Sequence, residues 1–279
     1  MSIAANRRQQ TIRSGVALAV AFFVFVVPFI FVFLNAAKPA PEAARPSFAL
    51  PGHWQLWQNL VEVVRARDYM LLLAYFNSTV ITVGAITLLV IFGAMVAYIL
   101  QRRNTRVSRI VFGFVLAGLM IPPAVVPTIW VLQGLHLFKT LHGMVLIQFA
   151  YGLPFTVLLF RAFIATIPRD LDEAALIDGA KPWQIFFRVV LPLLKPVTVT
   201  VIVVQSITIF NDFTHPLYYL PGNDNVTVQI TLYNFQSQFV SSMNLLFMNI
   251  LLVTIPPLIV FVFFNRQIIA GMTAGAVKG

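Results

Sequence analysis

The chain has 279 residues, of which 59% are hydrophobic and only 10% are charged, and its formal net charge is +10. Soluble globular domains carry about 25% charged residues, so the composition excludes a soluble domain and indicates a multi-pass membrane protein. The basic residues lie beside apolar segments and form no single stripe, which argues against nucleic-acid binding. There is no cysteine, which excludes disulfides and thiol chemistry, and the four histidines are scattered, so we expect no metal site.

The N-terminal part contains the first predicted span. Residues 1–15 are polar and should form a cytoplasmic N-terminus, and the apolar run 16–34 should be the first transmembrane helix. A secretory signal is the alternative, but signal cores have roughly 7–15 apolar residues and this run is longer, which favours a retained span. Residues 35–69 should form an external loop, in which Trp54 and Trp57 recur at helical spacing and predict an amphipathic interfacial helix. A loop that simply lies on the bilayer is the alternative.

Five further apolar segments predict the remaining spans, because each is near the roughly 20 residues that a bilayer core requires. They cover residues 70–100, 110–132, 143–164, 195–215 and 245–264. They leave a loop at 165–194, an external loop at 216–244 and a tail at 265–279. The prolines Pro122, Pro123 and Pro127 predict a broken helix in the third span, either beside a transport pathway or as a packing kink.

The distribution of basic residues predicts the orientation in the membrane. Of the 19 Lys and Arg residues, five lie on one side of the predicted spans, at Lys38, Arg45, Arg65, Arg67 and Lys139, and the other fourteen lie on the opposite side. Cytoplasmic loops are enriched in Lys and Arg. Both termini and the loop 165–194 should therefore be cytoplasmic.

That cytoplasmic loop carries a dense pattern. Asp170, Asp172 and Glu173 crowd the start of a predicted helix, where acids complement the helix dipole. Gly179 can take the left-handed conformation that ends a helix, and Pro182 suits the first position of the next one. In that second helix an apolar stripe is predicted by helical spacing, at Trp183, Phe186, Phe187 and Val190. Two short helices around a turn are more than a simple connection would need.

The loop resembles the EAA loop of ABC-importer permeases, on the residues Glu173, Ala174, Ala175, Gly179, Leu191 and Pro192. In that family the loop forms coupling helices that dock into a cytoplasmic ATPase. The resemblance implies that the ATPase-coupling residues are Glu173, Ala174, Ala175, Asp178, Gly179, Trp183, Phe186 and Phe187. The residue before the Pro-Trp pair is commonly Ser or Thr in the family, and here it is Lys181, which has no side-chain acceptor to cap the second helix.

Two further segments extend the resemblance to the carbohydrate, maltose-transporter-like type. The run Asn211-Asp212-Phe213 with Pro216-Leu217 resembles a Trp-Asn-Asp-Phe-x-x-Pro-Leu segment of such permeases, with Phe210 in place of the Trp. The final run 271–279 resembles the ending of one of their two paired permease subunits, which can enter the ATPase dimer interface. Its ATPase-contacting residues would be Gly271, Thr273, Gly275 and Lys278. A flexible polar terminus is the alternative.

The resemblance implies an all-α fold with six transmembrane helices, the type I ABC importer permease fold, with the permease domain at about 70–279. It implies half of a pathway for a di- or oligosaccharide that an external binding protein delivers to a bacterial or archaeal cell membrane. The implied partners are a homologous second permease and a cytoplasmic ATPase dimer that binds ATP and Mg.

Several polar residues of the spans are candidates for the translocation path. Gln205, Thr208 and Asp212 follow helical spacing along one line of the fifth span, and Asn77 begins a polar cluster in the second. The full candidate set is Asn77, Ser78, Gln205, Thr208, Asn211 and Asp212. Hydrogen bonding between packed helices is the competing role for all of them.

The sequence contains no phosphate-binding Gly-x-x-x-x-Gly-Lys-Ser/Thr motif and no hydrolase motif, so we expect no enzyme activity and no cofactor in this chain. A secondary transporter is one alternative, although internal repeats and intramembrane charges are not evident. A membrane scaffold subunit without transport activity is another, and it would make the EAA-like loop a coincidence.

Overall fold

The structure is a computed structural model that describes residues 13–276 except 18, 21 and 239–241, and every regular element in this part is a helix. The chain divides into two compact units: Met1–Leu71 with Thr231–Ile255, and Leu72–Ile230 with Pro256–Gly279. Three of the helices, α4 (Leu56–Arg102), α13 (Val228–Gln238) and α14 (Met243–Ala276), contribute to both units.

By length and composition, four described helices could cross a membrane: Arg13–Ala36, Leu56–Arg102, Leu141–Ile164 and Met243–Phe264. Two bent pairs raise the number to six if each pair is one span: Arg106–Met120 with Val125–Gly134, and Pro182–Leu193 with Lys195–Phe210. Their bends are 118° and 74°. The expected all-helical membrane architecture is therefore confirmed, with up to six spans among the described residues.

The first unit contains η1 (Phe22–Val26), α2 (Val27–Ala36), α3 (Ala40–Ala43) and the start of α4, together with most of α13 (Val228–Gln238) and the first part of α14. Its centre is polar. The ammonium group of Lys38, which is only 2% exposed, donates to Asn35 Oδ1 at 3.1 Å, and to the carbonyl and hydroxyl oxygens of Ser47 at 2.8 and 2.9 Å. Asn59 donates to the carbonyl oxygens of Ala36 and Lys38, and accepts from Asn244 at 2.8 Å.

Helix α4 contains a break in its first third. Arg67, Asp68 and Tyr69 have positive φ values of 50°, 53° and 60°, which non-glycine residues rarely adopt. The turn separates the segment expected to be an interfacial helix, where Trp57 is 71% exposed, from the segment expected to be the second span.

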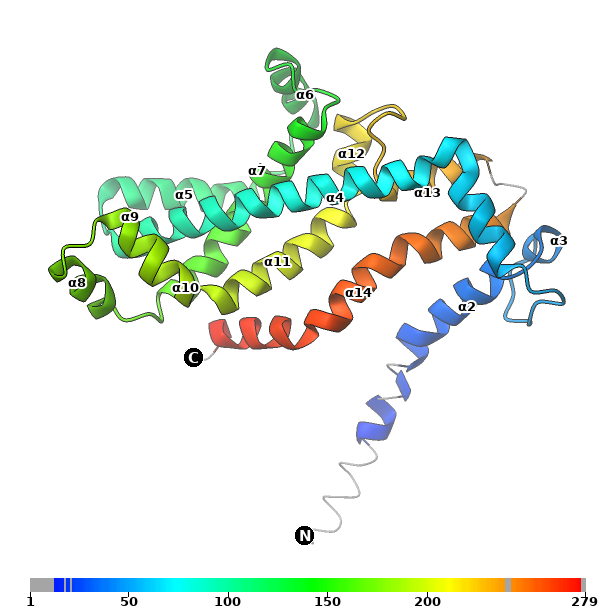
Figure 1. Cartoon of the computed structure of the whole chain (residues 1–279), viewed down its shortest axis with the longest axis horizontal. Coiled ribbons are helices and arrows are strands. Elements are labelled where there is room, and N and C mark those ends of the chain that lie inside the picture. Colours follow the sequence, from blue (N-terminus) through cyan, green and yellow to red (C-terminus); the bar gives the residue numbers. More distant parts are fainter. Residues whose placement is uncertain (1–12, 18, 21, 239–241, 277–279) are drawn as a thin grey trace, which may run out of the picture. The chain divides into compact units, whose positions relative to one another are not determined.

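The second unit contains the rest of α4 and α5 (Arg106–Met120), α6 (Val125–Gly134), α7 (Leu141–Ile164), α8 (Asp170–Ile177), α9 (Pro182–Gln184), η2 (Ile185–Val190), α10 (Leu191–Leu193), α11 (Lys195–Phe210) and α12 (Thr214–Tyr219). Helices α8 to α10 lie at one end of this unit, and α6 and α12 lie away from it (Figure 1). Glycines let α4 and α7 approach closely. A Cβ on Gly93 would lie 2.6 Å from Thr156 Cγ2, and one on Gly152 would lie 2.9 Å from Leu89 Cδ1.

The segment expected as one span over 110–132 is two helices, α5 and α6, bent by 118°. The break contains Pro122 and Pro123, which lack the N–H that a continuing helix requires. A proline also disfavours helical backbone in the residue before it, and Ile121 is extended, with φ −78° and ψ 122°. The prolines thus end α5.

Candidate functional site

The loop 165–194 forms two helical segments around a tight turn. Helix α8 begins at Asp170 with three acids in its first turn, and Gly179 ends the segment with φ +82°. The turn is closed by backbone hydrogen bonds from Gly179 to Leu176 at 3.0 Å and from Ala180 to Ala175 at 3.0 Å. This is the helix–turn–helix arrangement that the sequence pattern predicts, and the glycine is needed because an L side chain is strained at this φ.

The second segment is capped without a serine or threonine. The side-chain oxygen of Gln184 accepts a hydrogen bond from the backbone N–H of Lys181 at 2.8 Å. This is the half of a capping box that the third helical residue supplies. The Gln184 side chain thus satisfies the N–H of Lys181, while the Lys181 side chain itself makes no cap hydrogen bond.

The expected aromatic stripe divides between the core and the surface. Phe186 is only 5% exposed, and its ring packs against Tyr98 of α4 with centroids 5.5 Å apart. Trp183 and Phe187 remain 57% and 45% exposed. Three aromatic residues were expected to contact an ATPase. In this structure Trp183 and Phe187 are exposed enough to contact a partner protein, whereas Phe186 is buried.

Helix α8 adds an exposed apolar face that sequence reasoning did not single out. Leu176 and Ile177 are 61% and 86% exposed, directly before the turn at Gly179. Glu173, Ala174 and Asp178 are also exposed, and Ala175 is half-buried against the core. The sequence signal for this face was the pair of large apolar residues, Leu176 and Ile177, just before the helix-ending Gly179.

An ion pair fixes α8 to the end of α4. Arg102 Nε and Asp172 Oδ2 lie 2.6 Å apart, and the two side chains are 12% and 16% exposed. The hydroxyl of Tyr98 donates to Asp172 Oδ1 at 3.1 Å, and Arg102 also donates to the carbonyl oxygen of Ile167 at 3.2 Å. Sequence reasoning placed Asp172 in the helix but did not find these partners, because Arg102 is 70 positions away in the chain.

A second site lies between α7 and α11. A cavity of about 400 Å³ is lined by Gln148, Tyr151, Gly152, Phe155, Val204, Gln205, Thr208, Asp212 and His215. It brings together three of the six candidate path residues, namely Gln205, Thr208 and Asp212. Gln205 is 4% exposed and donates to Thr156 Oγ1 at 3.0 Å and to the carbonyl oxygen of Gly152 at 3.2 Å.

Asp212 is the acidic residue of this cavity. Its carboxylate accepts a hydrogen bond from the side chain of Gln148, and it lies 2.6 Å from His215 Nδ1. The His215 ring lies against Tyr151, with centroids 4.6 Å apart. The arrangement joins amide, hydroxyl, carboxylate and aromatic groups on one wall.

The other three candidate path residues have structural contacts outside this cavity. Asn77 and Ser78, both buried, bond to the backbone of Val226 and Val228 at 3.0 and 2.9 Å. The side chain of Asn211 accepts from Gln229 at 3.0 Å. These contacts are the helix-packing role that was the alternative for this set.

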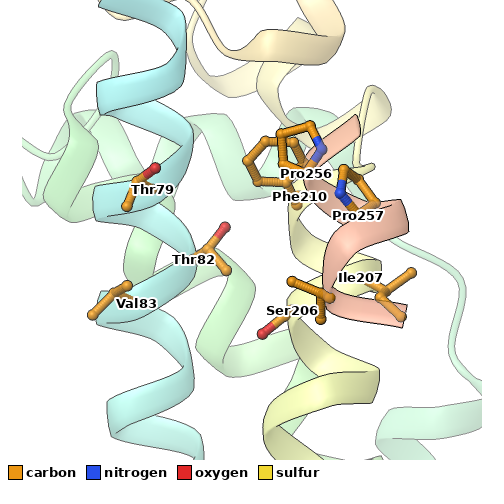
Figure 2. A pocket seen from close by; sticks show the side chains of 9 residues that line it. Thr79, Thr82, Val83, Ser206, Ile207, Phe210, Pro256 and Pro257 are labelled. Atoms are coloured by element: carbon orange, nitrogen blue, oxygen red, sulfur yellow. The ribbon is translucent and has the colours of Figure 1, made fainter. Parts of the chain in front are cut away.

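A smaller cavity of about 160 Å³ lies between α4, α11 and α14 and is lined mostly by apolar atoms. Figure 2 shows Thr79, Thr82 and Val83 on one helix opposite Ser206, Ile207 and Phe210 on another, with Pro256 and Pro257 alongside. The Ser206 hydroxyl donates to the carbonyl oxygen of Ile202 at 2.6 Å. Because its lining is mostly apolar, this cavity suits a polar solute less well than the cavity at Asp212 does.

The tail expected to contact an ATPase lies at the edge of the described part of the chain. The backbone of Gly271, Thr273 and Gly275 belongs to α14, which is helical to Ala276. Lys278 lies outside the described residues.

Comparison with known proteins gives a consistent result. Residues 89–274 match the family described as "Binding-protein-dependent transport system inner membrane component". The diacetylchitobiose uptake system permease protein NgcG of Streptomyces coelicolor is 31% identical over 91% of this chain and 85% of its own length. The melibiose/raffinose/stachyose import permease protein MelC of Bacillus subtilis is 34% identical over 74% of this chain and 76% of its own.

Among solved structures, a chain of a bacterial ABC transporter involved in the import of the acidic polysaccharide alginate superimposes with a TM-score of 0.81. The two chains are 20% identical, and the match covers 95% of this chain and 98% of that one. At this identity the likeness shows the fold alone, and it agrees with the expected importer-permease fold.

Proposed function

The chain belongs to the inner membrane components of binding-protein-dependent transport systems, and from this premise we propose that the solute it passes is a neutral di- or oligosaccharide. Membership makes it a multi-pass subunit of a prokaryotic inner membrane, a transport component and not the subunit that hydrolyses ATP. Relatives named for diacetylchitobiose and for melibiose, raffinose and stachyose support an oligosaccharide.

The observation that carries the proposal is the cavity between α7 and α11. Its volume of about 400 Å³ suits a sugar ring, and its wall alternates aromatic and hydrogen-bonding side chains. Tyr151 and Phe155 offer flat apolar surfaces to the C–H faces of a sugar. Thr208 and the amide of Gln148 can exchange hydrogen bonds with its hydroxyl groups.

Charge selects against acidic sugars. Among the residues that line the cavity, Asp212 is the carboxylate, His215 is its ion-pair partner when protonated, and none is Lys or Arg. A uronate or a phosphorylated sugar would meet like charge in an environment of low dielectric constant, where repulsion is strong. The proposed solute is therefore neutral.

The loop 165–194 would receive the motion of an ATPase. Exposed apolar side chains at Leu176, Ile177, Trp183 and Phe187 form a surface suited to a protein cleft, and aromatic residues dominate such contacts. Glu173 adds a charge-assisted contact at its edge. The ion pair of Asp172 with Arg102 would transmit the displacement of α8 to α4.

The assembly that this function requires has further parts. A homologous second permease would complete the pathway, and a cytoplasmic ATPase dimer would bind ATP and Mg. An external binding protein would deliver the sugar. The tail residues Gly271, Thr273, Gly275 and Lys278 would add a second contact with the ATPases.

A double variant of the cavity wall and a single hydroxyl variant outside it test the proposal in cells that carry the full importer. Thr208 and Ser206 both lie on α11, and each donates to the carbonyl oxygen four residues earlier, but only Thr208 lines the polar cavity. Uptake of labelled neutral oligosaccharides should fall about tenfold in a Thr208→Val, Phe155→Ala double variant. Ser206→Ala should leave it unchanged.

The membrane level of each variant is the control for insertion. Equal losses in the two variants would contradict a role for this cavity. Uptake of uronate oligomers in preference to neutral ones would contradict the proposed solute class.

A further inference from the structure

A third cavity, separate from the cavity at Asp212, is strongly basic and shares Arg103 with the surface at Trp183. It has a volume of about 260 Å³ and is lined by four arginines, together with polar residues such as Ser108 and one ring, Phe112. The arginines are Arg103, Arg109, Arg161 and Arg169. They come from the residue after α4, the start of α5, the end of α7 and the residue before α8, so the fold brings Arg103 and Arg109 together with cations from a distant part of the chain.

These arginines have no carboxylate partner among the described residues. Arg161 donates to Gln101 Oε1 at 3.0 Å and lies over the ring of Phe112 at 3.7 Å, and Arg169 donates to the carbonyl oxygen of Gln101 at 3.4 Å. Arg103 and Arg109 are exposed, and their side chains make no hydrogen bond or ion pair within that part of the chain. The nearby Asp172 is already paired with Arg102. Four gathered cations without a counter-ion attract an anion.

The residues around the cavity indicate which kind of anion it binds. The start of α5 exposes Val107, Ile110 and Phe114 at 69%, 60% and 74%, directly beside Arg109. This helix belongs to a candidate span, and the charge distribution puts its start on the cytoplasmic side. An occupant should therefore carry a negative group next to long apolar chains.

We propose that this cavity, here called the arginine pocket, binds the phosphate of an anionic phospholipid of the cytoplasmic leaflet. The phosphate is held by the guanidinium groups, which suit phosphate geometry, while the acyl chains cover the exposed apolar face of α5. The acidic side chain of a soluble partner would neutralise the arginines but would leave that apolar face uncovered.

The test uses the full-length chain in detergent and measures retained lipid by native mass spectrometry after mixing with phosphatidylglycerol or phosphatidylcholine. The site variant is Arg103→Gln with Arg109→Gln. The matched control is Arg106→Gln with Arg188→Gln, which removes the same charge from exposed arginines that do not line the pocket. Neither pair makes a side-chain bond that the fold requires, and thermal melting checks this.

We expect the site variant to bind phosphatidylglycerol about tenfold or more weakly and the control to bind it as the unchanged chain does. Phosphatidylcholine should bind weakly to all three proteins. Equal retention of phosphatidylglycerol by the two variants would overturn the proposal. Displacement of this lipid by an equal concentration of inorganic phosphate would overturn the lipid as the occupant. If the site variant loses ATPase association but retains the lipid unchanged, the occupant is an acidic side chain of a protein, and the lipid proposal is overturned.

Discussion

The coupling end, formed by α8, α9 and η2, and the polar cavity between α7 and α11 present opposite kinds of side chain. The coupling end exposes large apolar side chains on short helices whose positions are fixed from behind by the Asp172–Arg102 pair. In the cavity at Asp212 the polar groups are held by hydrogen bonds and the helices behind them are packed at glycines. The difference is the one that the proposed function requires, since an apolar surface suits a protein partner and a polar cavity suits a hydrated solute.

The largest effect should come from the turn of the coupling end. Gly179→Asp places an L side chain at φ +82° and an extra charge beside the apolar surface. We expect association with the ATPase, measured by co-purification, and solute uptake both to be lost while membrane insertion persists. Gly222→Ala is the control, because Gly222 also has a positive φ, of 116°, and open space around it. If both variants keep the ATPase, the coupling role is wrong.

The divided aromatic stripe gives the next effect. Phe186→Ala should destabilise the chain by about 3–5 kcal/mol, as truncation of a buried aromatic does, since Phe186 is 5% exposed. Trp183→Ala should leave the thermal midpoint nearly unchanged and weaken ATPase binding by about tenfold or more. Thermal unfolding and a binding titration separate the two. The comparison fails if Trp183→Ala melts as early as Phe186→Ala.

Loss of the Asp172–Arg102 ion pair, which holds α8 to α4, should have an intermediate effect. Asp172→Asn and Arg102→Gln should each cost about 2 kcal/mol, the usual cost of removing one hydrogen-bonded charge. The two costs should not add in the double variant, because both substitutions break the same interaction. Uptake should fall more than ATPase association, since the surface residues are unchanged. Additive losses would show that the two side chains act separately. Arg188→Gln is the control for charge.

The smallest effect concerns packing beside the polar cavity. Gly152→Ala should cost about 1–3 kcal/mol, because its Cβ would lie 2.9 Å from Leu89 Cδ1 and 3.3 Å from Gln205 Nε2. Gly113→Ala has nothing within 4 Å and should stabilise α5 slightly. Thermal melting of the two purified variants checks this. Equal melting would mean that the α4–α7 contact is looser than the structure shows.

Local chemistry made much of the coupling end predictable, and tertiary contacts decided the rest. The acids at the start of α8 and the positive φ of Gly179 follow from neighbouring residues alone. Helical spacing put Trp183, Phe186 and Phe187 on one stripe, but η2 is a π-helix over Ile185–Val190, whose wider turn changes that spacing. Which ring is buried also depends on Tyr98, far away in sequence.

The polar cavity was less predictable for a similar reason. A polar residue in a span can face a pathway or bond to a neighbouring helix, and the spacing is the same in both cases. Gln205, Thr208 and Asp212 line the cavity, whereas Asn77 bonds to Val226, 149 positions away. Gln148, Tyr151 and His215 complete the wall. They were missed because no local pattern links α7 to the segment after α11.

The length of α4 gives the ion pair at its end, between Arg102 and Asp172, a mechanical meaning. Within the second unit this helix runs from Leu72 to Arg102, about 45 Å at 1.5 Å per residue. A rod of that length turns a small rotation at one end into a large displacement at the other. Tilting it by about 5° around Arg102 moves its far end by about 4 Å, more than the diameter of a water molecule. In the proposed mechanism, a small displacement of the Asp172–Arg102 ion pair would therefore be enlarged at the far end of α4.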